Sequence, residues 1–120
     1  MKPLIAATLL LLCQVVVAGV ARTVRLDEKT VAAVKVTPGF TTILSFPMKP
    51  SKVLLGNRGL FGVEYVESDV AISALKPGAR SNMYVYLEGR RFAFSLSTAP
   101  SGGDEIILVR DATLKVWGRK

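Results

Sequence analysis

Histidine is absent from this 120-residue chain, and cysteine occurs only once, at Cys13. Without histidine, a Ser-His-Asp triad and a histidine-bound zinc site are both excluded. One cysteine cannot form an internal disulfide or a four-cysteine metal cluster. Any catalysis would have to rest on serine, lysine or carboxylate groups, and the sequence predicts neither a metal nor a cofactor.

Acidic residues are also scarce. The chain has nine Asp and Glu against 16 Lys and Arg, which gives a formal net charge of +7. Half of the residues are hydrophobic, and the mean hydropathy of +0.39 is high for a soluble domain. The length corresponds to one domain on the usual scale of roughly 100–200 residues per domain.

The N-terminal stretch accounts for much of the hydrophobicity. A positive start at Lys2 is followed by the almost entirely apolar residues 4–17, and small residues occur at Ala18 and Ala21. This order is typical of a secretory signal peptide. The apolar run is shorter than the roughly 20 residues that a membrane-spanning helix needs.

We expect signal cleavage near Ala18 or Ala21, with Ala21 favoured. Residues 1–21 are then the signal peptide, and 22–120 form one exported domain, periplasmic or associated with the outer membrane. Removal of Lys2 with the signal lowers the net charge from +7 to +6. An uncleaved membrane anchor and a lipoprotein signal at Cys13 are the alternative interpretations.

The rest of the chain consists of short runs in which apolar residues alternate with polar ones, bounded by Gly and Pro. This pattern predicts strands and no helix. The predicted strands are 31–37, 40–46, 52–55, 61–65, 69–75, 82–87, 91–97 and 106–109. About eight short strands at this spacing predict an all-β fold, an antiparallel β-sandwich that is immunoglobulin-like or small and barrel-like.

Alternation also predicts which side chains face the core, and Glu88-Gly89 predicts a tight hairpin turn. The expected inward side chains of four strands are Phe40, Thr42, Leu44, Phe46, Val70, Ile72, Met83, Val85, Leu87, Phe92, Phe94 and Leu96.

Three neighbouring carboxylates are the nearest approach to a catalytic set. Glu64, Glu67 and Asp69 could supply the carboxylate pair of a glycosidase. A solvated hairpin turn explains the same residues without any chemistry, and we favour it. The sequence therefore predicts a protein that is not an enzyme.

Basic residues are the better candidates for function, because positive loops attract lipid head groups or acidic partners. Trp117, the only tryptophan, is either a core residue or an anchor for another subunit. Export argues against nucleic acid as a partner, although Tyr84 and Tyr86 could stack on bases. The predicted partner-binding residues are Lys49, Lys52 and Arg58 near one connection, Arg90 and Arg91 after the hairpin turn, and Trp117.

Residues 34–97 resemble the amino-terminal domain of the TrbG/CagX family, a periplasmic component of type IV secretion and conjugation core complexes. Six segments carry the resemblance, and they occur in the family's order. They are VKVTPG at 34–39, TTILSFP at 41–47, VLLGN at 53–57, ISALKP at 72–77, NMYV at 82–85 and RFAFSL at 91–96. Two positions depart from the family pattern, since Asn57 replaces an acidic residue and Phe61 a tryptophan.

The resemblance implies a non-enzymatic periplasmic scaffold in an envelope-spanning complex. Expected partners are envelope proteins, including an outer-membrane lipoprotein, or further copies of the same chain. Family members usually carry a second β-domain, to which no part of this sequence corresponds. A pilus- or secretin-associated module that binds cell-wall polymer or a partner protein is the alternative.

Overall fold

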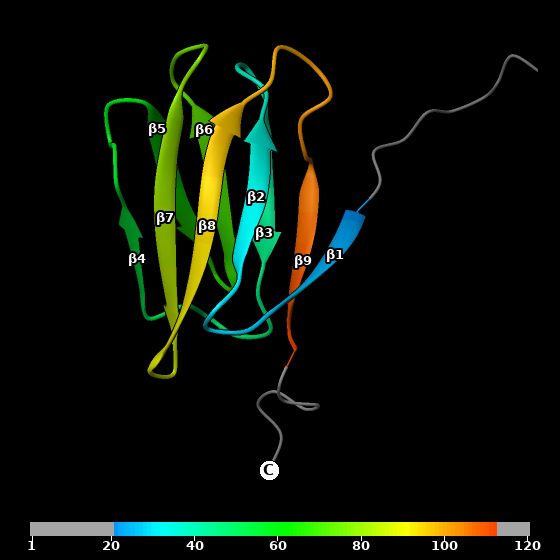
Figure 1. The fold of residues 1–120 in the computed structure, drawn as a ribbon, viewed down its shortest axis with the longest axis vertical. Helices are drawn as coiled ribbons and strands as arrows, with labels where there is room; N and C mark the ends of the chain where they lie inside the picture. The colour runs from blue at the N-terminus through cyan, green and yellow to red at the C-terminus, as the bar shows by residue number, and fades with distance from the viewer. Residues whose placement is uncertain (1–20, 113–120) are drawn as a thin grey trace, which may run out of the picture.

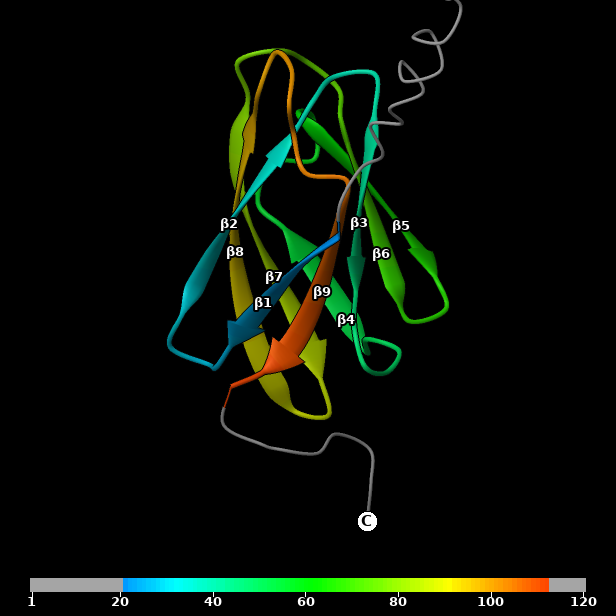
Figure 2. The same cartoon turned by 90° about the vertical axis from the view of Figure 1, so that its right-hand side faces the viewer.

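A computed structural model describes residues 21–112, and its strands form two sheets packed face to face (Figures 1 and 2). The nine strands are β1 (Ala21–Leu26), β2 (Val31–Val36), β3 (Thr41–Ser45), β4 (Lys52–Leu55), β5 (Phe61–Val66), β6 (Asp69–Ala74), β7 (Arg80–Leu87), β8 (Arg90–Thr98) and β9 (Ile106–Asp111). The described part has no helix, and hence none long and apolar enough to cross a membrane. Residues 1–20 of the predicted signal peptide and Trp117 lie outside the described residues.

One sheet has five strands in the order β1-β9-β3-β6-β5, and the other has four in the order β2-β8-β7-β4. The predicted all-β sandwich is confirmed. Four strand pairs are antiparallel, but β1 and β3 both run parallel to β9, and β2 runs parallel to β8. These parallel pairs join strands far apart in the chain, which residue alternation along one strand does not reveal.

The core lies between the sheets, where alternate side chains of each strand meet. On β7 and β8 the predicted inward residues are all buried, among them Met83, Val85 and Phe94. The rings of Phe46 and Phe94 meet edge to face with centroids 6.1 Å apart, and so connect the two layers. Burial of this alternating set is the main force that holds the sheets together.

Phe40 is the exception among the predicted inward residues. It precedes β3 and is 67% exposed, whereas Thr42, Leu44 and Phe46 are buried as predicted. The chain has not yet entered the ladder at Phe40, whose amide N–H still bonds to the Thr37 carbonyl in the preceding turn. The inward alternation therefore starts two residues later than the sequence pattern suggests.

The predicted hairpin at Glu88-Gly89 is confirmed, since these two residues join β7 to β8. Both have positive φ, 45° and 80° respectively. This combination matches the twist of the flanking strands in a two-residue hairpin. A further strand, β1, was not predicted, because only Leu26 of its six residues is buried and its sequence does not alternate clearly.

Candidate functional site

The carboxylates considered for catalysis lie around one hairpin. Glu67 occupies the two-residue turn between β5 and β6 with a φ of 54°, and Glu64 and Glu67 are exposed. This is the arrangement that the solvated-turn interpretation predicts. Within residues 21–112 no three His, Cys, Asp or Glu side chains are grouped so that they could hold a metal ion.

The structure separates the three basic residues that were predicted to cluster near one connection. Lys49 lies in the connection before β4, and Lys52 is the first residue of that strand. Arg58 comes three residues after Leu55, the last residue of β4, and so lies beyond the opposite end of that strand. The prediction of one Lys49–Lys52–Arg58 cluster is therefore wrong, because a strand runs through the middle of it.

Arg90 is engaged within the chain. Its guanidinium forms a bidentate ion pair with Asp111 at the end of β9. The same guanidinium lies 3.5 Å from the Glu28 carboxylate and over the Phe92 ring. The Asp111 side chain is fully buried, and that of Arg90 is only 19% exposed. This predicted partner-binding residue thus ties the two sheets together at one end of the sandwich.

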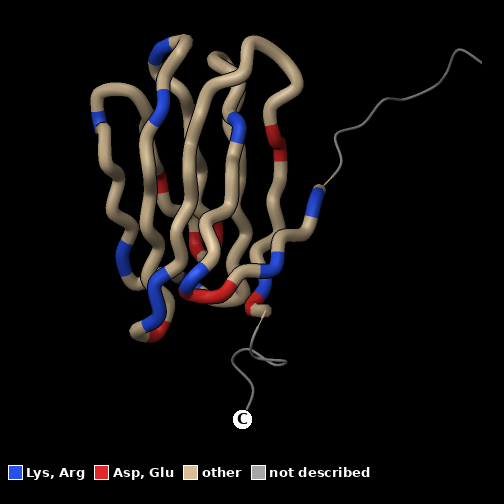
Figure 3. Tube along the Cα trace, in the orientation of Figure 1, with Lys and Arg blue, Asp and Glu red and all other residues tan. Residues whose placement is uncertain are grey.

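Charge is divided unequally between the sheets. The strands of the four-stranded sheet carry five cationic side chains and no carboxylate. Those of the five-stranded sheet carry three cations and three carboxylates, so their charges balance. Much of the basic character of the described domain therefore belongs to one layer of the sandwich (Figure 3).

Four of these five cations are exposed on the outer surface of the four-stranded sheet, which we call the basic face. The residues that alternate with the basic-face positions along these strands are, apart from Ser81, buried or packed against the core, so alternation places the four cationic side chains outward. The basic face consists of Val31, Ala33, Lys35, Lys52, Leu54, Arg80, Asn82, Tyr84, Tyr86, Arg91, Ala93, Ser95 and Ser97.

Strand register arranges the cations in two rows. One row holds Lys52 and Arg91 on either side of Tyr86, and the other holds Arg80 and Lys35 on either side of Ser97. Cations in one row are separated by one strand and so lie about 10 Å apart in backbone position, and the rows lie about 20 Å apart along β7. Four positive charges thus frame the basic face.

Two rows of paired residues lie between the cationic rows: one is aromatic and apolar, and the other, formed by Asn82, Ser95 and Ala33, is largely polar. Tyr84 is paired in register with Leu54 on one side and with Ala93 on the other, and Ala93 is paired with Val31. The Leu54 side chain is 37% exposed and that of Val31 is 62% exposed. The Arg91 guanidinium lies over the Tyr84 ring, 6.0 Å from its centroid, which restrains the guanidinium against the sheet.

Of the predicted partner-binding residues, the basic face contains Lys52 and Arg91. The sequence-based list of partner-binding residues contains neither Lys35 nor Arg80, and the predicted strand near Arg80 began only at residue 82, although both side chains point outward from a strand. The alternation of polar and apolar residues in the sequence could have identified both as outward-facing. Only the pairing of β2, β8 and β7 shows that Lys35 and Arg80 share a row.

The outer surface of the five-stranded sheet has a different character. Across its centre runs a row of paired residues, Ala21, Ile106, Ile43 and Ala71, which ends at Glu64 on the edge strand β5. Glu64 is the one charged member of this row, and Ile106 is 42% exposed. The two outer surfaces of the sandwich therefore offer different chemistry to their surroundings.

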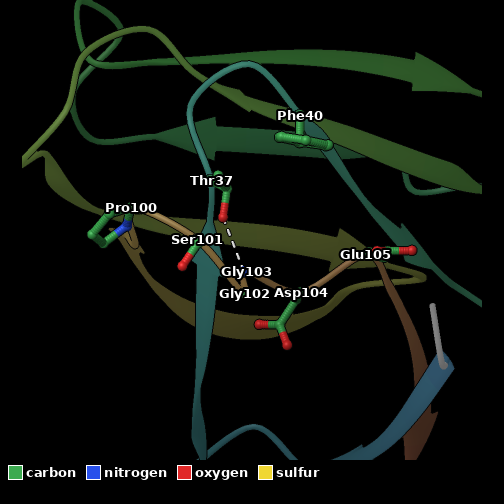
Figure 4. A pocket seen from close by; sticks show the side chains of 8 residues that line it. All are labelled: Thr37, Phe40, Pro100, Ser101, Gly102, Gly103, Asp104 and Glu105. Carbon is green, nitrogen blue, oxygen red and sulfur yellow. Dashed lines mark hydrogen bonds between the residues drawn. The ribbon is translucent and has the colours of Figure 1, made fainter. Parts of the chain in front are cut away.

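A hollow of about 230 Å³ lies where the turn before β3 meets the loop before β9 (Figure 4). The Gly103 amide N–H donates to Thr37 Oγ1 at 2.9 Å and joins the two segments, while the exposed Phe40 ring stands at its rim. Among its lining residues Asp104 has a charged partner, since Arg22 binds both of its oxygens. These contacts assign Asp104 a role in joining segments.

Comparison with known proteins adds no family to this geometry. No protein-family model matches the chain, and no curated protein matches it. The basic face is therefore the candidate site on the strength of the described residues alone, and the TrbG/CagX resemblance stays a prediction.

Proposed function

We propose that this protein is an exported, non-enzymatic assembly subunit of a cell-envelope complex of the type IV secretion or conjugation kind. The observation that carries the proposal is the basic face, a broad exposed sheet surface with four cations and two tyrosines. Arginine and tyrosine are enriched at protein–protein interfaces. The signal-like sequence at residues 1–21 supports export, and the ordered segments between 34 and 97 support the choice of system.

Electrostatics gives the basic face a way to select its partner. Four like charges on one surface, with no carboxylate on the same four strands, create a local positive potential. Such a potential accelerates encounters with acidic surfaces and disfavours basic ones. The sandwich would thus contribute a rigid, oriented surface to a larger assembly, in which no chemical step is required of it.

A pilus- or secretin-associated module that holds an anionic cell-wall polymer is the second candidate. The same framing cations favour it, because a polymer with regularly spaced anionic groups could lie along β7 between the two rows. Both candidates place the partner on the basic face, but they differ in what is captured there.

Crosslinking in intact cells, followed by purification through a C-terminal tag and mass spectrometry, tests the proposal. Recovery of an outer-membrane lipoprotein together with an inner-membrane subunit of a secretion channel is the expected result. Recovery of secretin or pilus proteins would favour the second candidate. A monomeric protein that captures no envelope component would contradict both.

A further inference from the structure

We infer that the occupant of the basic face is an acidic protein segment in which apolar side chains lie between carboxylates. This inference rests on the proposed function and names the chemistry of the partner. Its basis is the order of side chains along the sheet, where a cationic row, an apolar and aromatic row, a mostly polar row of Asn82, Ser95 and Ala33, and a second cationic row follow one another.

Complementarity dictates what such a surface accepts. The first row offers Lys52 and Arg91, and the second offers Arg80 and Lys35, all four of them exposed. Carboxylates are the anionic side chains that unmodified proteins present, and arginine binds them with two parallel hydrogen bonds. The apolar and aromatic row lies between the two cationic rows, and its Leu54 and Val31 are exposed. A partner with only charged side chains would leave this row in contact with water.

The state of Tyr84 favours protein over polysaccharide. A sugar ring stacks on a free aromatic face, but the Arg91 guanidinium lies over this ring at 6.0 Å. The Tyr84 hydroxyl also accepts a hydrogen bond from the Asn82 amide at 3.4 Å. Restrained in this way, Arg91 loses less conformational entropy when it binds a carboxylate, and binding of the carboxylate is correspondingly favoured.

The small polar residues of the basic face agree with a protein partner. Asn82, Ser95 and Ser97 lie among the tyrosines and arginines. Tyrosine, serine and asparagine, with arginine at the strongest contacts, are the side chains that antibody binding sites use for protein surfaces. A second copy of this chain does not fit the basic face through the same surface, because four cations would then meet four cations.

Site-specific photocrosslinking in cells tests the inference. A photoreactive phenylalanine analogue is placed at Leu54 or Ser95 on the basic face, and at Glu64 on the opposite sheet as the matched position. We expect Leu54 and Ser95 to capture a protein peptide with net negative charge. Arg91→Glu should lower the yield of this crosslinked product about tenfold. Replacing the partner carboxylate nearest to residue 91 by lysine should restore the yield.

The outcomes separate this inference from the proposed function. A neutral or basic peptide at Leu54 and Ser95, or a product that muramidase rather than protease degrades, overturns the acidic-segment assignment. Capture of envelope proteins from Glu64 alone also overturns it but leaves the assembly role standing. If none of the three positions captures an envelope component, the assembly role fails as well.

Discussion

Arg22 on β1 and Asp104 before β9 form a bidentate ion pair, with Arg22 Nε 3.1 Å from Asp104 Oδ1 and Arg22 Nη2 3.2 Å from Asp104 Oδ2. Arg22 Nη2 also donates to the Ala33 carbonyl at 3.0 Å, and the Lys35 amide donates to Asp104 Oδ2 at 2.9 Å. Since Ala33 and Lys35 belong to β2, this pair joins the edges of both sheets. It gives the little-buried strand β1 a specific attachment.

Removing Asp104 should cost more than removing Arg22. Asp104→Ala deletes the acceptor of the Lys35 amide as well as the ion pair, and should lower the free energy of unfolding by about 1–2 kcal/mol. Arg22→Ala deletes the same ion pair and the hydrogen bond to the Ala33 carbonyl, but because the arginine side chain is 45% exposed, it should cost only about 0.5–1 kcal/mol. Urea unfolding measures both, and equal losses would contradict a separate role for the amide contact.

Stability should fall in acid because of the same carboxylate. Burial raises the pKa of Asp104, but the hydrogen bonds from Arg22 and the Lys35 amide outweigh burial and hold the pKa below its usual value. A pKa lowered by folding stabilises the protein above the unfolded value of about 3.9, and this stabilisation is lost as the pH falls through the folded pKa. Asp104→Asn should therefore flatten the dependence of stability on pH below about 4.

Unfolding of wild type and Asp104→Asn at several pH values between 2 and 6 measures this effect. Asp27, whose pKa is also lowered, by hydrogen bonds from the Thr30 hydroxyl and the Lys29 amide, remains in both proteins. Parallel stability curves for the two proteins would contradict the assignment to Asp104.

The buried Arg90–Asp111 pair should be strongly coupled. Arg90→Met removes a charged partner of a fully buried carboxylate, and such removals cost about 3–5 kcal/mol. The double variant Arg90→Met/Asp111→Leu removes both charges and should recover part of that loss. A double-mutant cycle by urea unfolding measures the coupling, and additive losses would show that the pair does not act as a unit.

Gly103 should tolerate no side chain. An added Cβ would lie 2.6 Å from Thr37 Oγ1, 2.8 Å from Thr37 N and 2.9 Å from Lys35 O, two of which are backbone atoms. Gly103→Ala should therefore destabilise the fold by about 1–3 kcal/mol. Gly62→Ala is the matched control, because its Cβ would meet only Leu75 Cδ2 at 3.8 Å, and an equal loss there would contradict the steric explanation.

Much of the fold could be predicted from the sequence because inward and outward side chains alternate clearly. The pattern at Met83, Val85 and Leu87 and the turn at Glu88-Gly89 follow from local rules, and both are confirmed. The parallel partners of β2 and β9 could not be predicted, because they depend on contacts between distant segments. Strand β1 was missed for the same reason. Its pairing with the distant strand β9 defines it, whereas few of its side chains are buried.

The candidate site was predicted only in part. Lys52 and Arg91 were predicted as partner-binding residues, but proximity in sequence wrongly grouped Lys52 with Arg58. Arg90 is adjacent to Arg91, yet the opposite phase of the strand turns it inward to Asp111. To assign a charged side chain to one face of a sheet, one must know which residues of its strand point outward. To place two such side chains in the same row, one must also know the register between strands.

Charge reversal on the basic face tests the central claim most directly. The variant Lys52→Glu/Arg91→Glu is compared, in pull-downs from crosslinked cells, with Arg25→Glu/Lys76→Glu, which alters the net charge equally outside the basic face. We predict that the first variant loses its envelope partners by about tenfold or more while the second retains them, with both folded by circular dichroism. Equal recovery of the same partners by both variants would contradict the claim that the basic face binds them.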